Sequence, residues 1–178
     1  MSVIIPVHKE SCMTSPVIAV YPGTFDPLTL GHEDIVRRAA RMFDRVVIAV
    51  AMAHHKKTLF TLPERLALTR EAMADCSNVE VDAYDGLVVD YLAQRGATVM
   101  VRGVRSVTDF DYEFQLAGMN RRLSPEVDTV LLYTQDVHQC VSSTLVREIN
   151  MLGGDVEQFV SPTVYRRLRD KRAGAQPA

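Results

Sequence analysis

Residues 23–32 read GTFDPLTLGH, and this block lies between an apolar run at 17–21 and an amphipathic stretch at 31–43. The run VIAVY predicts a buried strand, because it contains no charged or strongly polar side chain. The stretch after the block predicts a helix, since its apolar residues gather near one face: Ile35, Val36, Ala39, Met42 and Phe43. The block is therefore predicted to be the loop of a strand–loop–helix unit.

The same alternation continues along the chain. Residues 46–52 read VVIAVAM, which is typical of a parallel strand covered on both faces. Thr61 and Glu64 predict a capping box that opens a helix. Further strands are predicted at 79–83, 98–101 and 129–133, and further helices at 87–95, 109–123, 143–151 and from Ser161 onward. Five strands alternating with helices predict an α/β fold with a doubly wound, five-stranded parallel sheet of the Rossmann-like type, in a single domain.

The globular domain is predicted over residues 16–171. Residues 1–15 have a mixed composition without periodicity, so we expect a loose N-terminal extension, within which Met13 offers an alternative start. Residues 172–178 are expected to form a C-terminal tail.

Composition narrows the class of protein. The 178 residues are 47% hydrophobic and 24% charged, and the net charge of −2 argues against a dedicated nucleic-acid binder. The cysteines are odd in number, no two of them are close in the sequence and no Cys-x-x-Cys pair exists, so we expect neither a disulfide framework nor a zinc site: Cys12, Cys76 and Cys140. No apolar stretch approaches the ~20 residues of a membrane span, and the run at 3–7 is too short for a signal sequence. We therefore expect a cytoplasmic protein with no membrane or nucleic-acid partner.

Polar and cationic residues follow four of the predicted strands, in the segments 23–32, 54–57, 102–105 and 135–144. Because the carboxyl ends of parallel strands face one side of a sheet, these segments should converge on one crevice. The crevice would hold a helix N-terminus, several hydroxyls, and the cationic or imidazole side chains of His32, Lys56, Arg102 and Arg105. Such a site suits polyanionic phosphates.

Taken singly, these residues have simpler interpretations. Arg102 and Arg105 could pair with carboxylates such as Asp109 or Asp111, and residues 142–144 could merely cap the helix that follows. Their joint placement at strand ends favours the functional interpretation.

Other nucleotide-binding and catalytic patterns are absent from the sequence. It contains neither a P-loop nor G-x-G-x-x-G. No nucleophile stands with a matched base, so Cys140 is expected to line the site rather than to react.

The block at 23–32 resembles the first signature of the nucleotidyltransferase superfamily that includes the cytidylyltransferases. Its T/H-x-G-H core stands here as TLGH at 29–32, and VSSTLVR at 141–147 resembles the second signature, I-S-S-T-x-x-R. Over about 18–168, the segments YPGTFDP, KK, FTL, RGVR and DFDYE together resemble the bacterial phosphopantetheine adenylyltransferase family.

This resemblance implies transfer of the adenylyl group of ATP to 4′-phosphopantetheine, giving dephospho-coenzyme A and pyrophosphate. It also implies Mg²⁺ bound mainly through ATP or pyrophosphate, with no protein ligand assigned to the metal. The resemblance further implies that the protein forms a homohexamer and that coenzyme A inhibits it by feedback.

The resemblance also assigns residue roles. His32 matches the residue that stabilises the transition state, with Thr24, Lys56 and Arg102 as further catalytic residues. The phosphopantetheine side is matched by Thr24, Lys56, Val88 and Arg102. The nucleotide side is matched by Thr24, Phe25, His32, Gly103, Val104, Arg105, Glu113, His138, Gln139, Cys140, Val141, Ser142, Ser143 and Thr144.

Three positions depart from the family pattern. His138 and Cys140 stand where the family often has an aromatic and a bulky apolar residue, so adenine packing is expected to differ here. Val88 replaces what is often a longer aliphatic residue, so the pantetheine wall is expected to be looser.

Two alternatives stay open. One is a sister nucleotidyltransferase that takes another phosphorylated acceptor or uses CTP, and the other is a non-catalytic adenine-nucleotide sensor. A relative of the aminoacyl-tRNA synthetases is disfavoured, because the sequence shows no anticodon-binding domain and no basic excess.

Overall fold

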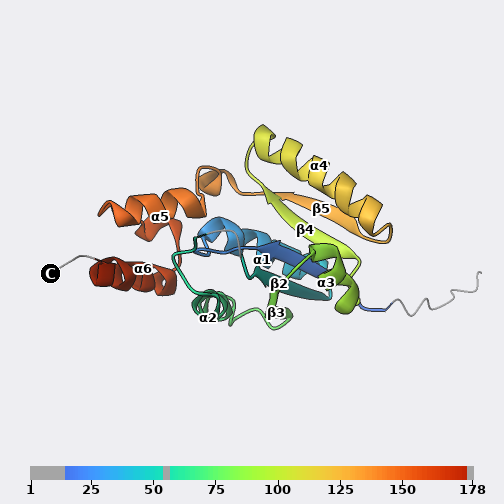
Figure 1. Cartoon of the computed structure of the whole chain (residues 1–178), viewed down its shortest axis with the longest axis horizontal. Coiled ribbons are helices and arrows are strands. Elements are labelled where there is room, and N and C mark those ends of the chain that lie inside the picture. The colour runs from blue at the N-terminus through green and yellow to red at the C-terminus, as the bar shows by residue number, and fades with distance from the viewer. Residues whose placement is uncertain (1–14, 54–56, 176–178) are drawn as a thin grey trace, which may run out of the picture.

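The computed structural model describes residues 15–53 and 57–175, and its elements alternate as the sequence predicts (Figure 1). The strands are β1 (Ile18–Gly23), β2 (Arg45–Ala51), β3 (Val79–Tyr84), β4 (Val99–Val104) and β5 (Asp128–Tyr133). The helices are α1 (Leu30–Met42), α2 (Leu62–Ala72), α3 (Val88–Gln94), α4 (Val107–Leu123), α5 (Ser143–Met151) and α6 (Pro162–Ala175). Two short 3-10 turns, absent from the sequence prediction, are η1 (Asp136–His138) and η2 (Glu157–Phe159).

All five strands run parallel in one sheet, in the order β3-β2-β1-β4-β5. The predicted doubly wound α/β fold is therefore confirmed. The strand order reverses between β1 and β4, which lie side by side at the centre of the sheet. In open parallel sheets, ligands bind at such a switch point, beyond the carboxyl ends of the strands.

Apolar side chains cover both faces of the sheet, as the continuous apolar runs predict. One core packs α1, α2 and α6 against the sheet through residues such as Ile35, Leu68 and Leu168. The second core packs α3 against the other face through Val89 and Leu92. Helix α4 lies along β4 and β5 (Figure 1). The central strands are thus buried on both sides, which leaves their carboxyl ends as the accessible edge.

The pairing between β1 and β4 is short. Strand β1 keeps register with β2 along its whole length. Its register with β4 is limited to two pairs, Ala19 with Val99 and Val20 with Met100. Beyond these pairs the two strands part, so the crevice at the switch point begins inside the sheet itself.

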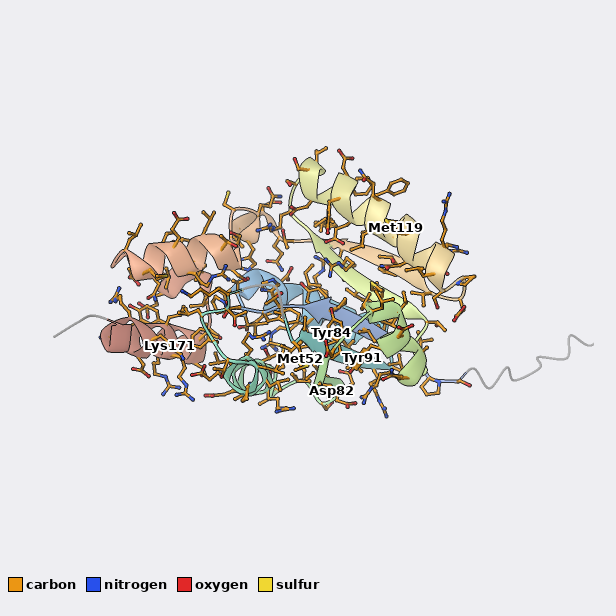
Figure 2. The ribbon with its side chains drawn as sticks, in the orientation of Figure 1. Met52, Asp82, Tyr84, Tyr91, Met119 and Lys171 are labelled. Carbon is orange, nitrogen blue, oxygen red and sulfur yellow. The ribbon has the colours of Figure 1, made fainter. Side chains whose placement is uncertain are left out.

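A tyrosine fixes α3 against the edge strand β3. The Tyr91 hydroxyl donates to Asp82 Oδ2 at 2.8 Å, and its ring centroid lies 5.5 Å from that of Tyr84 (Figure 2). Burial, and then the hydrogen bond to the Asp82 carboxylate, raises the pKa of Tyr91. The short connection that leads into Val88 is therefore held close to the sheet.

Helix starts follow side-chain capping. Thr61 and Glu64 form the predicted capping box at the start of α2. Helix α4 begins at Val107, two residues before the predicted start, because the Ser106 hydroxyl accepts the Asp109 N–H at 3.1 Å.

Helix α6 continues to Ala175, beyond the predicted domain boundary at residue 171. Within residues 15–53 and 57–175, no helix combines the length and apolarity that crossing a membrane requires.

Candidate active site

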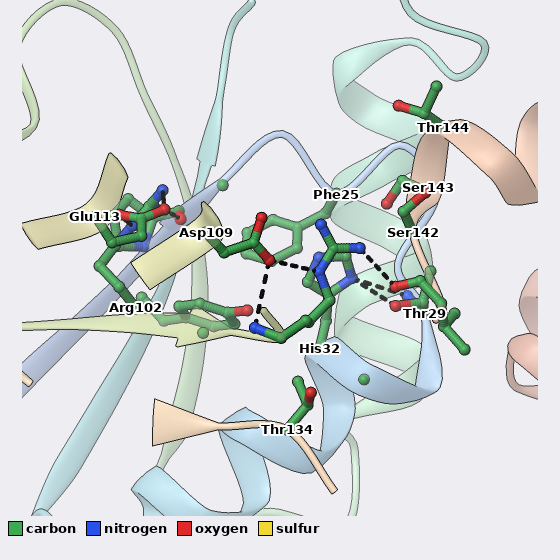
Figure 3. A pocket seen from close by; sticks show the side chains of 17 residues that line it. Phe25, Thr29, His32, Arg102, Asp109, Glu113, Thr134, Ser142, Ser143 and Thr144 are labelled. Carbon is green, nitrogen blue, oxygen red and sulfur yellow. Dashed lines mark hydrogen bonds and ion pairs between the residues drawn. The ribbon is translucent and has the colours of Figure 1, made fainter. Parts of the chain in front are cut away.

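A pocket of about 290 Å³ opens where β1 and β4 part (Figure 3). Its walls come from the carboxyl ends of β1, β4 and β5, the first turn of α1, helix α4 and the start of α5. The lining residues are Tyr21, Pro22, Gly23, Phe25, Thr29, Gly31, His32, Arg102, Gly103, Arg105, Asp109, Glu113, Thr134, Val141, Ser142, Ser143 and Thr144.

Helix α1 presents a histidine of defined tautomer to this pocket. Thr29 is the N-cap of the helix, and its backbone N–H donates to Nδ1 of His32 at 3.1 Å. The Thr29 hydroxyl lies 2.9 Å from the same nitrogen. Because Nδ1 accepts a backbone N–H, the neutral ring must carry its proton on Nε2. His32 therefore has one N–H left to donate to a ligand.

The surroundings keep the His32 ring uncharged. Burial lowers its pKa first, and the charges of Arg105 and Arg102 lower it further, to about 4. The Phe25 ring packs edge-on against it, with centroids 5.3 Å apart. At neutral pH, His32 is therefore a neutral hydrogen-bond donor, neither an acid nor a base.

We expect the His32 ring signal in NMR spectra to hold steady as the pH falls through ~6.5, the ordinary histidine value. It should shift only as the pH approaches about 4. Because the unfolded chain takes up this proton first, His32 should also reduce native-state stability as the pH falls through the same window. Spectra of ¹³C-histidine-labelled protein, assigned by loss of the signal in His32→Gln, give the measurement. A midpoint near ~6.5 would contradict the proposed neutral role.

Phe25 reaches His32 through an unusual backbone conformation. Its φ of 49° lies in the left-handed region, which costs a non-glycine residue about 1–3 kcal/mol. The ring folds back over Gly23, where an added Cβ would lie only 2.7 Å from the ring atom Cζ. Gly23 therefore leaves room for the Phe25 ring, and a larger residue there would displace the ring from His32.

Arg102 is held by a carboxylate across the site. Its Nε and Nη2 donate to the two carboxylate oxygens of Glu113 at 2.7 and 2.6 Å. Burial opposes its charge, but the hydrogen bonds and attraction from Glu113 outweigh burial and raise the pKa of Arg102. Its Nη1 donates to the Pro22 carbonyl at 2.9 Å, which bridges the gap between β4 and β1.

Arg105 is paired in the same manner. Its Nε donates to Asp109 at 3.0 Å, which confirms the ion pair considered from the sequence, and its Nη1 donates to the Val141 carbonyl at 2.9 Å. Both arginines of the pocket therefore have carboxylate partners. A bound phosphate must share these guanidinium groups with Glu113 and Asp109.

A second helix N-terminus opens into the pocket. Ser142 caps α5 by accepting the Leu145 N–H at 3.1 Å, as the capping interpretation of this segment predicts. The Ser143 hydroxyl donates to the Pro27 carbonyl at 2.8 Å, which ties α5 to the loop after β1. First-turn N–H groups have no partner within a helix and attract anions. The N-termini of α1 and α5 both line this pocket, so it can bind phosphate through backbone groups.

A buried arginine organises the loops behind the pocket. Arg65 of α2 is only 1% exposed. Its Nη1 donates to the carbonyls of Thr24 and Ala51 at 2.7 and 2.8 Å, and its Nε donates to the Phe60 carbonyl at 3.2 Å. Arg65 thus links the loop after β1, the end of β2 and the entry to α2.

Asp26 ties together the same region and the two sequence signatures. Its carboxylate accepts the N–H groups of Leu59 and Phe60 at 2.8 and 2.9 Å. Arg147, the last residue of the second signature, donates to Asp26 Oδ2 at 3.3 Å and also to its carbonyl oxygen. The first and second signatures therefore meet through a direct contact.

Most residues assigned to the nucleotide side line this pocket, and Arg102 joins them. They are Phe25, His32, Gly103, Arg105, Glu113, Val141, Ser142, Ser143 and Thr144. Val104 and Gln139 instead line an adjoining pocket of about 360 Å³, which shares Arg105 and Thr134 with the first.

The remaining predicted residues lie elsewhere. Within the described part of the chain, Thr24, His138, Cys140 and Val88 line neither pocket. The Thr24 carbonyl binds Arg65. His138 lies behind Gly31, at which an added Cβ would sit 3.6 Å from the His138 Cβ. Lys56 lies outside the described residues, so its role stays a prediction.

Some lining residues were not predicted as site residues. They are Tyr21, Pro22, Gly23, Thr29, Gly31, Asp109 and Thr134. Thr29 carried a usable signal, since a threonine three residues before His32 predicts a cap. Thr134 carried none, because a threonine at a strand end has no distinctive spacing.

Known proteins resemble this chain closely. The cytidylyltransferase-like family profile matches residues 20–149. The phosphopantetheine adenylyltransferase of Acidovorax sp. (strain JS42) is 66% identical over 155 residues, which cover 87% of this chain and 94% of that protein. Its namesake from Bordetella pertussis (strain Tohama I) is 52% identical over 155 residues, covering 87% and 92%.

A solved structure shares the fold at low identity. The bifunctional NMN adenylyltransferase/ADP ribose pyrophosphatase from Francisella tularensis matches 88% of this chain and 49% of its own, with a TM-score of 0.68 at 15% identity. The close relatives and the family profile agree with the two signatures in the sequence. The chain belongs to the phosphopantetheine adenylyltransferases, within the cytidylyltransferase-like family.

Proposed function

We propose that this enzyme transfers the adenylyl group of ATP to 4′-phosphopantetheine, forming dephospho-coenzyme A and pyrophosphate in coenzyme A biosynthesis. The observation that carries the proposal is the neutral His32 donor in a pocket lined by the N-termini of α1 and α5. The names of the close relatives supply the identity of the two substrates.

The reaction is a direct displacement between two polyanions. A phosphate oxygen of 4′-phosphopantetheine attacks the α-phosphorus of ATP, the bond from that phosphorus to the β-bridging oxygen breaks, and pyrophosphate leaves. A phosphomonoester has a second pKa of ~6, so the attacking oxygen is already ionised and needs no general base. Catalysis then rests on alignment and on stabilising charge at the α-phosphate. The Nε2–H of His32 suits this task, because it donates a hydrogen bond without requiring a proton transfer.

Residues that line the pocket, together with others near it, suit the two substrates. The leaving pyrophosphate would be bound by Arg105 and the start of α5, at residues 142–144. The phosphate of the acceptor would be bound by Arg102, with Thr24 and Lys56, and the pantetheine arm would run towards Val88. In this arrangement, substrate phosphates share the arginines with Glu113 and Asp109.

Magnesium fits this site as a companion of the nucleotide. Among residues 15–53 and 57–175, no cluster of three or more His, Cys, Asp or Glu side chains could hold a metal. The two pocket carboxylates are each paired with an arginine. Mg²⁺ commonly binds through substrate phosphates and waters with few protein ligands. When bound in this way, it would neutralise charge on the triphosphate.

The outer surface of α4 supports an oligomer. Tyr112, Met119 and Leu123 recur on one side of the helix and are 65%, 65% and 62% exposed (Figure 2 labels Met119). An apolar surface of this kind is typical of a protein–protein contact. We propose that copies of the chain pack together in a cytoplasmic homohexamer, with coenzyme A as a feedback inhibitor. Sedimentation of the wild type and of Met119→Glu tests the contact. If both proteins sediment with the mass of a monomer, the proposed contact is wrong.

Pyrophosphate release from ATP and Mg²⁺, with and without 4′-phosphopantetheine, tests the proposed reaction. We expect release only when the acceptor is present, with dephospho-coenzyme A as the product. Nicotinate mononucleotide in place of the acceptor, and CTP in place of ATP, serve as controls. Release with another pair alone would contradict the proposed substrates, and ATP binding without turnover under any condition would favour the sensor alternative.

A further inference from the structure

At the pocket wall, the hydroxyl of Thr134 has no hydrogen-bond partner in the part of the chain that the structure describes. Thr134 is only 4% exposed, and its Oγ1 makes no hydrogen bond within the described residues. Buried polar atoms are nearly always hydrogen-bonded, so an unpaired buried hydroxyl that faces a pocket points to a hydrogen bond with a bound ligand. Figure 3 shows the Thr134 side chain extending from the end of β5 towards the pocket.

The other aliphatic hydroxyls of the pocket lining are already engaged. The Thr29 hydroxyl contacts His32 Nδ1 at 2.9 Å, and the Ser142 hydroxyl accepts the Leu145 N–H. The remaining two have the partners that follow: Ser143 donates to the Pro27 carbonyl, and Thr144 accepts from Arg147. Thr134 is thus the pocket threonine whose hydroxyl is free to meet a ligand, within residues 15–53 and 57–175.

The position of Thr134 indicates which part of a nucleotide it meets. Its own N–H is used in the sheet, where it donates to the Val104 carbonyl at 3.0 Å. It belongs to neither of the helix N-termini that suit phosphates. It lines both pockets, and the adjoining one is walled by apolar side chains that include Val107, Phe110 and Tyr133. Thr134 therefore lies between the phosphate end of the site and an apolar end.

A nucleotide has the same polarity, with charged phosphates at one end and a flat, uncharged base at the other. A threonine hydroxyl oxygen can accept a hydrogen bond, so it can pair with the 6-amino donor on the edge of adenine. We infer that Thr134 is a specificity-determining residue that hydrogen-bonds the edge of the adenine base. This inference rests on the proposed use of ATP and adds a side-chain contact to the base.

Thr134→Val tests the inference, because it removes the hydroxyl and keeps the shape. Loss of one buried hydrogen bond should raise KM for ATP about tenfold. The KM for 4′-phosphopantetheine should not change. The kcat should stay within about threefold of the wild-type value, because a contact to the base is not a contact to the charge that develops in the transition state. Thr134→Ser keeps the hydroxyl, so it should retain a KM for ATP near that of the wild type.

Nucleotide analogues locate the partner. With purine riboside triphosphate, which lacks the 6-amino group, wild type and Thr134→Val should have the same KM. With 2′-deoxy-ATP, the tenfold difference should persist. The opposite pattern is a KM difference between wild type and Thr134→Val that disappears with 2′-deoxy-ATP and persists with the purine analogue. That pattern would overturn the assignment to the base and place the contact at the ribose. An unchanged KM for ATP in Thr134→Val would overturn the assignment of Thr134 to either group. Failure of the proposed function is a different result, since the wild type itself would then be inactive with ATP and 4′-phosphopantetheine.

Discussion

Replacing His32 with alanine should lower kcat by ~10²–10³-fold, the usual effect of losing one preorganised donor to a developing charge. The donor is preorganised because the Thr29 N–H occupies Nδ1 and leaves the proton on Nε2. Affinity for ATP should change much less than kcat, since the bond strengthens in the transition state. Rates at saturating concentrations of both substrates give the measurement.

Two further variants separate the role of each ring nitrogen. Glutamine reaches as far as Nε2 and offers an N–H there, so His32→Gln should recover part of the lost rate. Asparagine is shorter and places its amide near the Nδ1 position, so His32→Asn should stay close to the alanine variant. If the alanine variant turns over at nearly the wild-type rate, the histidine is structural. Equal rates for the glutamine and asparagine variants would contradict a donor at Nε2.

Replacing Arg65 with methionine should cost the native state more than ~3 kcal/mol. The substitution removes the hydrogen-bond donor of three backbone carbonyls, and each unpaired buried acceptor costs about 1–3 kcal/mol. Because those carbonyls belong to the loops behind the pocket, activity should fall as well. Arg70→Met on the same helix is the matched control, since Arg70 is exposed and donates, among the described residues, a side-chain hydrogen bond to the Val81 carbonyl. Its expected cost is below ~0.5 kcal/mol.

Urea unfolding at one fixed protein concentration compares the two variants, because an oligomer makes stability depend on concentration. The fixed concentration leaves the side chain as the variable. Equal midpoints for the two arginine variants would show that the buried hydrogen bonds of Arg65 do not hold the loops together.

The sequence predicts the fold well because the fold depends on local patterns. Apolar runs such as 46–52 are long enough to mark buried strands, and Thr61 with Glu64 marks a helix start without any tertiary information. The block at 23–32 predicts the position of the site, since a loop after a central strand must face the carboxyl edge of the sheet.

What sequence analysis misses depends on partners that are distant or belong to the backbone. Arg65 lies within an ordinary helical pattern, and its partners are carbonyl groups, which no residue type reveals. Arg102 and Glu113 pair across a strand and a helix, so their spacing gives no signal. The pocket is consequently less cationic than a count of its arginines suggests.

The parting of β1 from β4 has a further consequence for the backbone. Pro22 lies within β1, a central strand, where a proline would normally interrupt the ladder because it has no N–H to donate. Its carbonyl faces β4 and accepts from Arg102, so the missing N–H falls on the same open side. Pro22 therefore leaves the pairing of β1 with β2 intact. At the same level it cannot donate a backbone hydrogen bond to β4, so it disfavours pairing between β1 and β4. The opening between β1 and β4 is therefore favoured by the covalent structure of the chain at Pro22.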